Sequence, residues 1–311
     1  KLINLMSKKI VFMGTPEFSV PTLEVLHKSS YKLECAYSQP PKKSLRGQKI
    51  NSSPVQITSE RLGIKVRNPL DLNSNEEYEY FKSLKPHLVI VVAYGKIIPK
   101  KYLSLSEKGF LNIHASLLPK WRGAAPIQRS IMNRDRTTGI SFMKIEEDLD
   151  EGPFCKQIEV NIEEQTTTGQ LTKKLSILGS KNIIDCVDDI SKDKVKFITQ
   201  DHSKATYSKK ITKEESKINW KKPANEIIAK INGLNPSPGA WFNLDGVRCK
   251  VWKAATSNLR GREGEIIGDD LIIACKEQSI KVLEIQREGK KKMKISDFLS
   301  GTKIKKGTIL I

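Results

Sequence analysis

Two polar residues with acid–base and hydrogen-bonding side chains stand on one short apolar segment of this chain. Asn112 and His114 lie two residues apart in FLNIH, a segment that predicts a strand over 110–114. Side chains two positions apart project from the same face of a strand, and burying them is costly unless they find partners. A loop with Pro and Gly follows, so both residues stand at the carboxyl end of this strand, where open α/β sheets bind their ligands.

A cluster of acids lies further along the same stretch. Asn can donate a hydrogen bond to a developing oxyanion, and His carries protons near neutral pH. A carboxylate can orient the His ring and stabilise its charged form. Gly152 indicates a tight turn, which favours Asp148 and Asp150 as the acids that project inward. Spacing alone does not choose among the members of the cluster, which are Glu146, Glu147, Asp148, Asp150 and Glu151.

The chain carries no sequence pattern of an activated nucleophile. It has no G-x-S-x-G motif, and none of its five cysteines lies near His114 in the sequence. We therefore expect direct attack by a substrate group, without a covalent intermediate on the protein. The cysteines and the four histidines make no recognisable zinc-binding spacing, so we expect no metal site.

The elements that must position these residues alternate along the chain. Strands are predicted at 9–13, 33–38, 64–67, 88–94, 110–114, 138–146 and 153–160, and helices near 17–28, 55–62, 76–84, 125–132 and 167–189. The continuous apolar run at 88–94 is typical of a central parallel strand. The alternation predicts an α/β fold of the Rossmann type, with a mostly parallel sheet and helices on both faces.

The 311 residues are enough for about two domains. We expect a catalytic domain over 7–190, a linker over 191–209 and a C-terminal domain over 210–311. In the C-terminal domain, helices are predicted near 212–217 and 224–232, and strands at 247–254, 264–268, 271–275, 280–286 and 292–295. Short strands between turn residues predict a small antiparallel β-barrel, OB-like among the options. Trp241 and Trp252 are expected to pack in its core.

The net charge of +19, from 54 basic and 35 acidic residues, favours a polyanionic partner. A lysine-rich surface without such a partner explains the charge almost equally well. Lysines concentrate in 203–222 and 287–306 of the second half, which fits a nucleic-acid surface.

The first half has a long insert after Ser38, and long loops in compact domains are usually functional or disordered. Its basic residues, with no acid before Ile50, are Lys42, Lys43, Arg46 and Lys49.

Targeting segments are not evident. No run approaches the roughly 18 apolar residues of a membrane span, and the first residues, KLINLMSKK, are too short and too charged for a secretory signal. An odd, scattered set of cysteines suggests a reducing compartment. We therefore expect a cytoplasmic protein without membrane contact.

The stretch NIHASLLPKWRGAAPIQ, followed by LDEG, resembles the folate-dependent formyltransferases. Further segments resemble the branch of that family that acts on methionyl-tRNA, namely VFMGTPEFSVPTLEVL, the basic SQPPKKSLRGQK, and NPSPGAWF with KVWKA. The resemblance runs from about Lys9 to the C-terminal domain. It implies transfer of the formyl group of 10-formyltetrahydrofolate to the α-amino group of methionine on initiator tRNA, for translation initiation.

The resemblance also implies roles for individual residues. The catalytic positions match Asn112, His114 and Asp150. The folate-binding segment matches Ser116, Leu117, Leu118 and Pro119. Arg46 matches a loop arginine used against the tRNA acceptor end, and the lysines beside it are Lys42, Lys43 and Lys49. The insert has Lys-Ser-Leu-Arg-Gly where the family more often has Pro-Ala-Gly-Arg-Gly. One large ligand bound over two basic surfaces suits a monomer.

Two other functions stay open at this point. A formyltransferase that acts on an amino-sugar nucleotide or a purine precursor would share the fold and the three catalytic residues. An RNA-binding protein without catalysis would keep the basic surfaces, but it has no use for Asn112, His114 and Asp150 together.

Overall fold

The computed structural model describes residues 8–44 and 49–310, and the chain divides into two compact units. The first unit is made of residues 1–123, 139–160 and 172–207. The second unit is made of residues 124–138, 161–171 and 208–311. Each unit has its own cluster of buried apolar side chains, so each has a core around which it folds.

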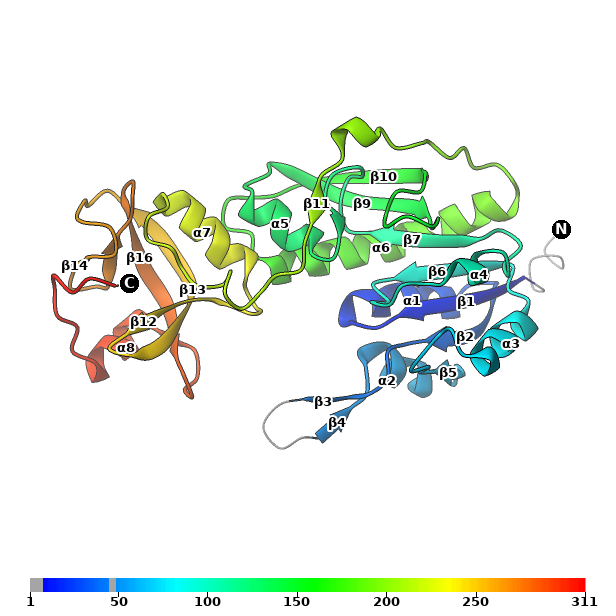
Figure 1. The fold of residues 1–311 in the computed structure, drawn as a ribbon, viewed down its shortest axis with the longest axis horizontal. Coiled ribbons are helices and arrows are strands. Elements are labelled where there is room, and N and C mark those ends of the chain that lie inside the picture. The colour runs from blue at the N-terminus through cyan, green and yellow to red at the C-terminus, as the bar shows by residue number, and fades with distance from the viewer. Residues whose placement is uncertain (1–7, 45–48, 311) are drawn as a thin grey trace. The chain divides into compact units, whose positions relative to one another are not determined.

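A seven-stranded sheet runs through the first unit in the order β10-β9-β7-β6-β1-β2-β5 (Figure 1). Its strands are β1 (Lys9–Gly14), β2 (Lys32–Tyr37), β5 (Val66–Arg67), β6 (Leu88–Val92), β7 (Phe110–His114), β9 (Thr137–Lys144) and β10 (Phe154–Asn161). The pairs from β7 through β6, β1 and β2 to β5 are parallel, and β7 pairs antiparallel with β9. The predicted mostly parallel α/β sheet is therefore confirmed.

Helices cover both faces of this sheet. On one face, Phe81 of α3 (Asn75–Leu84) and Tyr102 of α4 (Lys100–Leu103) share a buried cluster with Val11 and Met13 of β1. On the other face, α6 (Thr168–Ser191) brings Gly179 against the side chain of Ile113. The remaining helices of this unit are η1 (Glu17–Ser19), α1 (Val20–His27), α2 (Pro54–Arg61) and η2 (His202–Lys204). All five residues of β6 are buried, as a central strand between two helical layers requires.

The strand order reverses beside β1. The chain builds outward from β1 to β2 and β5, and then returns to the other side of β1 with β6 and β7. Open α/β sheets bind ligands at such a switch point, at the carboxyl ends of the strands. Asn112 and His114 close the carboxyl end of β7, next to β6, so the fold places them near this point.

The second unit contains a six-stranded antiparallel sheet in the order β12-β13-β16-β15-β14, with β17 paired to β16. Its strands are β12 (Ala240–Leu244), β13 (Val247–Ser257), β14 (Ile266–Gly268), β15 (Ile272–Ala274), β16 (Ser279–Arg287) and β17 (Met293–Lys294). Its helices are α5 (Pro126–Met132), α7 (Ala224–Gly233) and α8 (Ile295–Gly301). The antiparallel C-terminal sheet that the sequence predicted is confirmed, and two short strands, β8 (Arg122–Gly123) and β11 (Tyr207–Ser208), pair apart from both large sheets.

The expected core positions of Trp241 and Trp252 are wrong. Both side chains are half-buried, because alternate residues of β12 and β13 face the core and these two face outward. Arg248 lies over the Trp241 ring and Lys250 lies over the Trp252 ring. The tryptophan in the core is Trp220, which is 4% exposed and packs edge-on against Phe242.

Some predicted elements differ from the structure. The predicted helix over 212–217 is a run of turns, in which Lys217 makes an isolated bridge with Trp241. Strand β12 was missed, since its sequence follows two prolines and carries turn signals. The basic insert was expected as a loop, and it contains a strand pair, β3 (Lys42–Ser44) with β4 (Lys49–Asn51).

No helix within residues 8–44 and 49–310 has both the length and the apolar character that crossing a bilayer requires.

Candidate active site

Asn112 and His114 lie at the carboxyl end of β7, as the sequence predicted. In the sheet, Asn112 is opposite Val91 of β6 and His114 is opposite Ser141 of β9. His114 is 6% exposed, and Asn112 is half-buried. Within the described part of the chain, the Asn112 carboxamide has no hydrogen-bond partner. Its donor group is therefore free to bind a substrate atom at this strand end.

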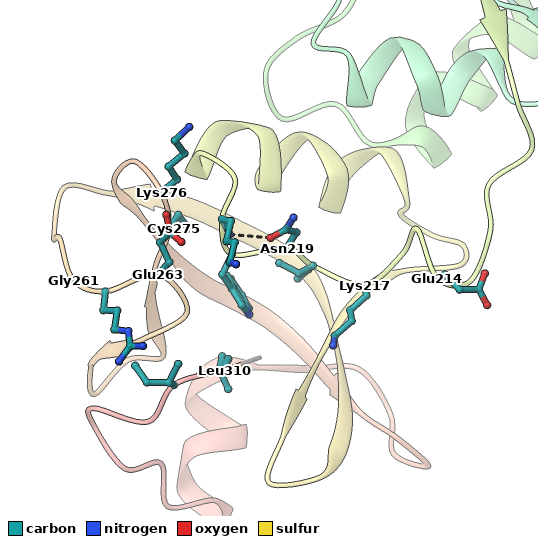
Figure 2. Close-up of a pocket in the computed structure, with 13 residues that line it drawn as sticks. Glu214, Lys217, Asn219, Gly261, Glu263, Cys275, Lys276 and Leu310 are labelled. Atoms are coloured by element: carbon teal, nitrogen blue, oxygen red, sulfur yellow. Dashed lines mark hydrogen bonds between the residues drawn. The ribbon is translucent and has the colours of Figure 1, made fainter.

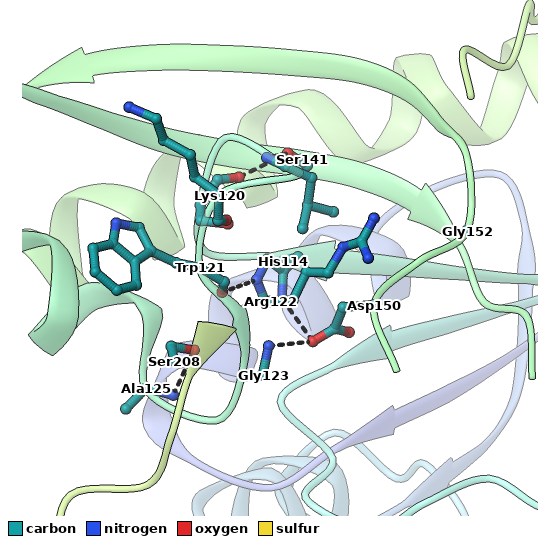
Figure 3. Close-up of polar contacts among 12 residues, drawn as sticks. His114, Lys120, Trp121, Arg122, Gly123, Ala125, Ser141, Asp150, Gly152 and Ser208 are labelled. Carbon is teal, nitrogen blue, oxygen red and sulfur yellow. Dashed lines mark hydrogen bonds and ion pairs between the residues drawn. The ribbon is translucent and has the colours of Figure 1, made fainter. Parts of the chain in front are cut away.

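The ring of His114 lies between two acceptors. Its Nε2 atom is 3.0 Å from the backbone oxygen of Trp121, and its Nδ1 atom is 3.6 Å from Oδ2 of Asp150 (Figure 3). A carbonyl oxygen only accepts, so Nε2 donates and carries a proton. Nδ1 is then the ring atom at which a further proton can be taken up or released, beside a carboxylate that stabilises it.

Asp150 reaches His114 from a turn with unusual backbone geometry. Its φ of 55° lies in the left-handed region, which residues other than glycine seldom adopt. Its Oδ2 atom accepts a hydrogen bond of 2.8 Å from the backbone N–H of Gly123, and its side chain is 15% exposed. Gly152 lets the turn close, because a Cβ there would lie 1.9 Å from the backbone oxygen of Lys144.

The other acids of the cluster face elsewhere. Glu146, Glu147 and Asp148 are exposed, and Glu147 pairs with Lys100 at 2.5 Å. Glu151 pairs with Arg122 at 2.8 Å. Of the two inward candidates that the turn favoured, the structure therefore brings Asp150 to His114 and leaves Asp148 in solvent.

The predicted folate segment, Ser116 to Pro119, is hydrogen-bonded to β9 through Ser141. The hydroxyl of Ser141 donates to the backbone oxygen of Ser116 at 2.7 Å and accepts the N–H of Leu118 at 3.0 Å. The Ser116 hydroxyl donates to the backbone oxygen of Lys120 at 2.6 Å. Because Ser116 and Leu118 are buried, the half-exposed Leu117 and Pro119 are the members whose side chains remain open to a ligand.

The sequence did not indicate the groups that orient this site. The carbonyl of Trp121 and the N–H of Gly123 are backbone atoms, and no side-chain pattern marks them. The buried Arg122 lies between them, and its partner Gln200 is 78 residues further along the chain. Arg122 stands inside the motif WRGAAPIQ, so a buried role for it could have been suspected, whereas Gln200 carries no local signal.

The basic residues of the insert are not all placed by the structure. Lys43 and Lys49 belong to the backbone ladder of β3 and β4, and the exposed Lys42 donates to Oε1 of Gln39 at 2.6 Å. Arg46 lies outside the described residues.

The second unit has a separate pocket of about 850 Å³, shown in Figure 2. Four basic side chains line it, those of Lys217, Lys221, Arg262 and Lys276, with the acids Glu214 and Glu263. The candidate catalytic residues are not among its lining residues. Neither unit, over its described residues, contains three or more His, Cys, Asp or Glu side chains grouped to hold a metal ion.

Comparisons with known proteins match nearly the whole chain. The sequence profile of the family described as formyl transferase matches residues 8–187, and that of the formyl transferase C-terminal domain matches residues 210–303. The chain is 54% identical to the methionyl-tRNA formyltransferase of Pelagibacter ubique (strain HTCC1062) over 305 residues, which cover 97% of this chain and 98% of that protein.

Solved structures share the fold at lower identity. The methionyl-tRNA formyltransferase from Clostridium thermocellum matches with a TM-score of 0.56 at 16% identity, over 81% of this chain and 94% of that one. HypX from Aquifex aeolicus, in complex with tetrahydrofolic acid, matches with a TM-score of 0.63 at 15% identity, over 96% of this chain and 50% of that one. At these identities the structures support a common fold and nothing finer.

Proposed function

Because the chain belongs to the formyl transferase family, we propose that it transfers the formyl group of 10-formyltetrahydrofolate to the α-amino group of methionine on initiator tRNA, for translation initiation. The observation that carries the chemistry is the free Asn112 carboxamide beside the His114–Asp150 pair at one strand end. The acceptor is supported by the near full-length similarity to the methionyl-tRNA formyltransferase of Pelagibacter ubique.

In the first step, the neutral amine attacks the formyl carbon and a new C–N bond forms. An α-amino group titrates near about 7.7–8.0 in reference peptides, so a useful fraction is neutral at cellular pH. The carbonyl oxygen becomes an oxyanion, to which Asn112 donates a hydrogen bond. One preorganised donor of this kind is worth about 3–4 kcal/mol of barrier.

In the second step, protons move and the bond from the formyl carbon to N10 breaks. The attacking nitrogen loses one proton, and N10 of the folate gains one as it leaves. Nδ1 of His114 is the exchange site for this proton, because Nε2 donates to the Trp121 carbonyl. Asp150 stabilises the charged ring at 3.6 Å, a distance that suits an ion pair better than a direct hydrogen bond.

The folate is proposed to lie along Ser116, Leu117, Leu118 and Pro119, the segment that begins just after His114. Hydrogen bonds through Ser141 hold the backbone of this segment in place, and Leu117 and Pro119 offer apolar surface to a flat ring. We assign no metal to this reaction; the donor set of Asn, His and Asp acts through hydrogen bonds and proton transfer.

The tRNA is proposed to bind through basic side chains in two places. Arg46, with Lys42, Lys43 and Lys49, would contact the acceptor end, and residues 210–311 would contact the tRNA backbone. All the basic residues in 287–306 are exposed, which suits contacts to phosphates. In this proposal residues 7–190 perform catalysis, 191–209 link the two parts, and a cytoplasmic monomer binds one tRNA.

The decisive experiment offers labelled 10-formyltetrahydrofolate with separate acceptors. We expect formyl transfer to methionyl initiator tRNA, and much less to the elongator methionyl-tRNA. Transfer to an amino-sugar nucleotide or a purine precursor instead would reassign the acceptor within the same family. RNA binding without any formyl transfer would reject catalysis altogether.

A further inference from the structure

A polar network with two fully buried members, Arg122 and Gln200, contacts the turn that carries Asp150. Arg122 is 1% exposed and Gln200 is 3% exposed. The guanidinium of Arg122 donates to Oε1 of Gln200 from Nε at 3.1 Å and from Nη2 at 2.9 Å. Its third nitrogen, Nη1, lies 2.8 Å from Oε1 of Glu151. We call these three residues, Arg122, Gln200 and Glu151, the Arg122 network.

The orientation of the Gln200 carboxamide follows from its partners. A guanidinium only donates, so the oxygen of Gln200 must face Arg122. Its Nε2 atom then donates to two backbone oxygens, that of Asp150 at 2.9 Å and that of Gly152 at 2.7 Å. Every donor and acceptor of this amide is used. If the amide were flipped, its NH2 group would face the Arg122 donors and its oxygen would face the backbone oxygens of Asp150 and Gly152.

The contacts of the Arg122 network fall on consecutive residues of the turn. Gln200 binds the backbone of Asp150 and Gly152, and Arg122 binds the side chain of Glu151 between them. On the other side of the turn, the N–H of Gly123 donates to the carboxylate of Asp150. A non-glycine residue at φ 55° persists only where its surroundings hold it there.

We propose that Gln200, oriented by Arg122, is a positioning residue for formyl transfer. It does not touch the reacting atoms. It fixes the backbone of Asp150, so that the carboxylate meets Nδ1 of His114 at the distance the structure shows. The kinetic part of this inference rests on the proposed function, because it needs a reaction in which Asp150 acts.

The first variant is Gln200→Met, which keeps the length of the side chain and removes both hydrogen bonds to the turn. A displacement of about 1 Å at a reacting group can cost about 100-fold in rate. We expect kcat to fall about 10- to 100-fold, while KM for the folate and for the tRNA stays within about twofold. A wild-type kcat in the folded variant would overturn the proposal.

A second variant covers the case in which Gln200→Met fails to fold. Gln200→Glu keeps the shape and the contact with Arg122, but it sets a carboxylate oxygen against the backbone oxygens of Asp150 and Gly152. We expect the same loss of kcat from this variant. Unchanged turnover in a folded Gln200→Glu enzyme would count equally against the positioning role.

Arg67→Met, in the same unit, is the control for an effect on kcat that comes from lost stability alone. Arg67 pairs at 2.5 Å with Glu77, whose side chain is 6% exposed, and it contacts no residue of the Arg122 network. Removing it leaves a buried charge without its partner, which destabilises the fold. We expect a lower melting temperature and an unchanged kcat at temperatures where the variant is folded. A fall in kcat equal to that of Gln200→Met would mean that both losses reflect stability, and the proposal would be abandoned.

The test of mechanism is a double-mutant cycle with Asp150→Asn. If Gln200 acts through the Asp150 carboxylate, then Gln200→Met should lower kcat less than about twofold once that carboxylate is gone. An equal loss in both backgrounds would show that Gln200 acts independently of Asp150. If the wild-type protein does not formylate methionyl-tRNA, the proposed function itself is rejected. If the wild type is active and the kcat losses of Gln200→Met and Asp150→Asn are additive, only the positioning role is rejected.

Discussion

Nδ1 of His114 lies 3.6 Å from Oδ2 of Asp150, near enough for an ion pair and too far for a strong direct hydrogen bond. The opposite nitrogen of the ring is already bound to a backbone carbonyl at 3.0 Å. The two distances together give the ring nitrogens different roles: Nε2 keeps its proton in a hydrogen bond, and Nδ1 is the nitrogen that can exchange one. In the proposed mechanism the proton is therefore exchanged at Nδ1.

The first prediction concerns this pair. His114→Ala and Asp150→Asn should each lower kcat by at least about 100-fold, because each removes part of the proton transfer. Binding of the tRNA should stay within about twofold, since neither residue belongs to the basic surfaces. Single-turnover kinetics and tRNA binding assays measure the two effects. Near-normal turnover in both variants would remove the pair from the mechanism.

Asn112 has a separate prediction. Asn112→Ala should lower kcat by about 100- to 1000-fold with little change in folate affinity, because its hydrogen bond is made to the oxyanion. Asn133→Ala is the matched control, since the amide of Asn133 donates to Asp135 at 2.6 Å and contacts none of the three candidate catalytic residues among the residues that the structure describes. That control should turn over at the wild-type rate. A rise in KM for the folate without a loss of kcat would assign Asn112 to substrate binding instead.

Arg46 is predicted to serve tRNA binding. Arg46→Ala should weaken tRNA affinity and reduce the slope of log affinity against log salt by about 0.7–0.9 if one phosphate contact is lost. Folate affinity should not change. Arg61→Ala is a control, because Arg61 is 63% exposed and pairs with Glu24 at 2.7 Å. Wild-type affinity that shows no dependence on salt would mean that the positive charge of the protein serves no polyanion.

The pH dependence of stability can be predicted at Glu215. Its hydrogen bond with Arg129 holds the pKa of this carboxyl below its usual value of 4.5. A carboxyl whose pKa is lowered by folding adds stability above that value, and the contribution disappears as pH falls through the folded-state pKa. Glu215→Gln should therefore be less stable than wild type at neutral pH, and the difference should shrink below pH 4.5.

Urea unfolding at several pH values measures this difference. The control is Glu226→Gln, whose partner Lys222 lies at 3.2 Å with both side chains well exposed. An exposed pair contributes little, so this variant should match wild type across the range. A Glu215→Gln difference that persists unchanged in acid would contradict the assignment to Arg129.

Gly152 is predicted to be irreplaceable in the Asp150 turn. In Gly152→Ala the new methyl group would lie 1.9 Å from the backbone oxygen of Lys144, so the turn must move. We expect a loss of about 1–3 kcal/mol in unfolding free energy, together with a fall in kcat. Gly301→Ala is the control, because nothing lies within 4 Å of a Cβ there. An active, stable Gly152→Ala would show that the turn tolerates displacement.

The placement of Asn112 and His114 was predictable because it depends on local period and strand order. Side chains alternate between the two faces of the strand FLNIH, so Asn112 and His114 share one face. The apolar run at 88–94 predicts the neighbouring parallel strand. Spacing could not choose Asp150 among five acids, since that choice depends on a left-handed backbone and on contacts with Gly123. The resemblance to a family selected Asp150, and the structure brings it to His114.

The residues that hold the Asp150 turn could not be predicted from the sequence, for a physical reason. Arg122 and Gln200 are 78 residues apart, and a buried amide chooses its partners only after the chain has folded. The tryptophans show that residue type alone also gives wrong predictions of burial. Residue type favours burial of Trp241 and Trp252, but the alternation of their strands turns both outward, and Trp220 fills the core instead.

Peptide groups, rather than side chains, orient both His114 and Asp150. The Trp121 indole points away from Asp150 in Figure 3, while the Trp121 carbonyl accepts from the His114 ring and the Gly123 N–H binds the carboxylate. No substitution at position 121 removes its carbonyl, so a survey of point mutants can find that position tolerant even though its oxygen orients the ring. At position 123 only proline removes the N–H, and proline cannot adopt the φ of 109° that Gly123 has. An ester in place of the Arg122–Gly123 amide would remove the donor and keep every side chain, so chemical synthesis rather than mutagenesis is the way to measure what this N–H contributes.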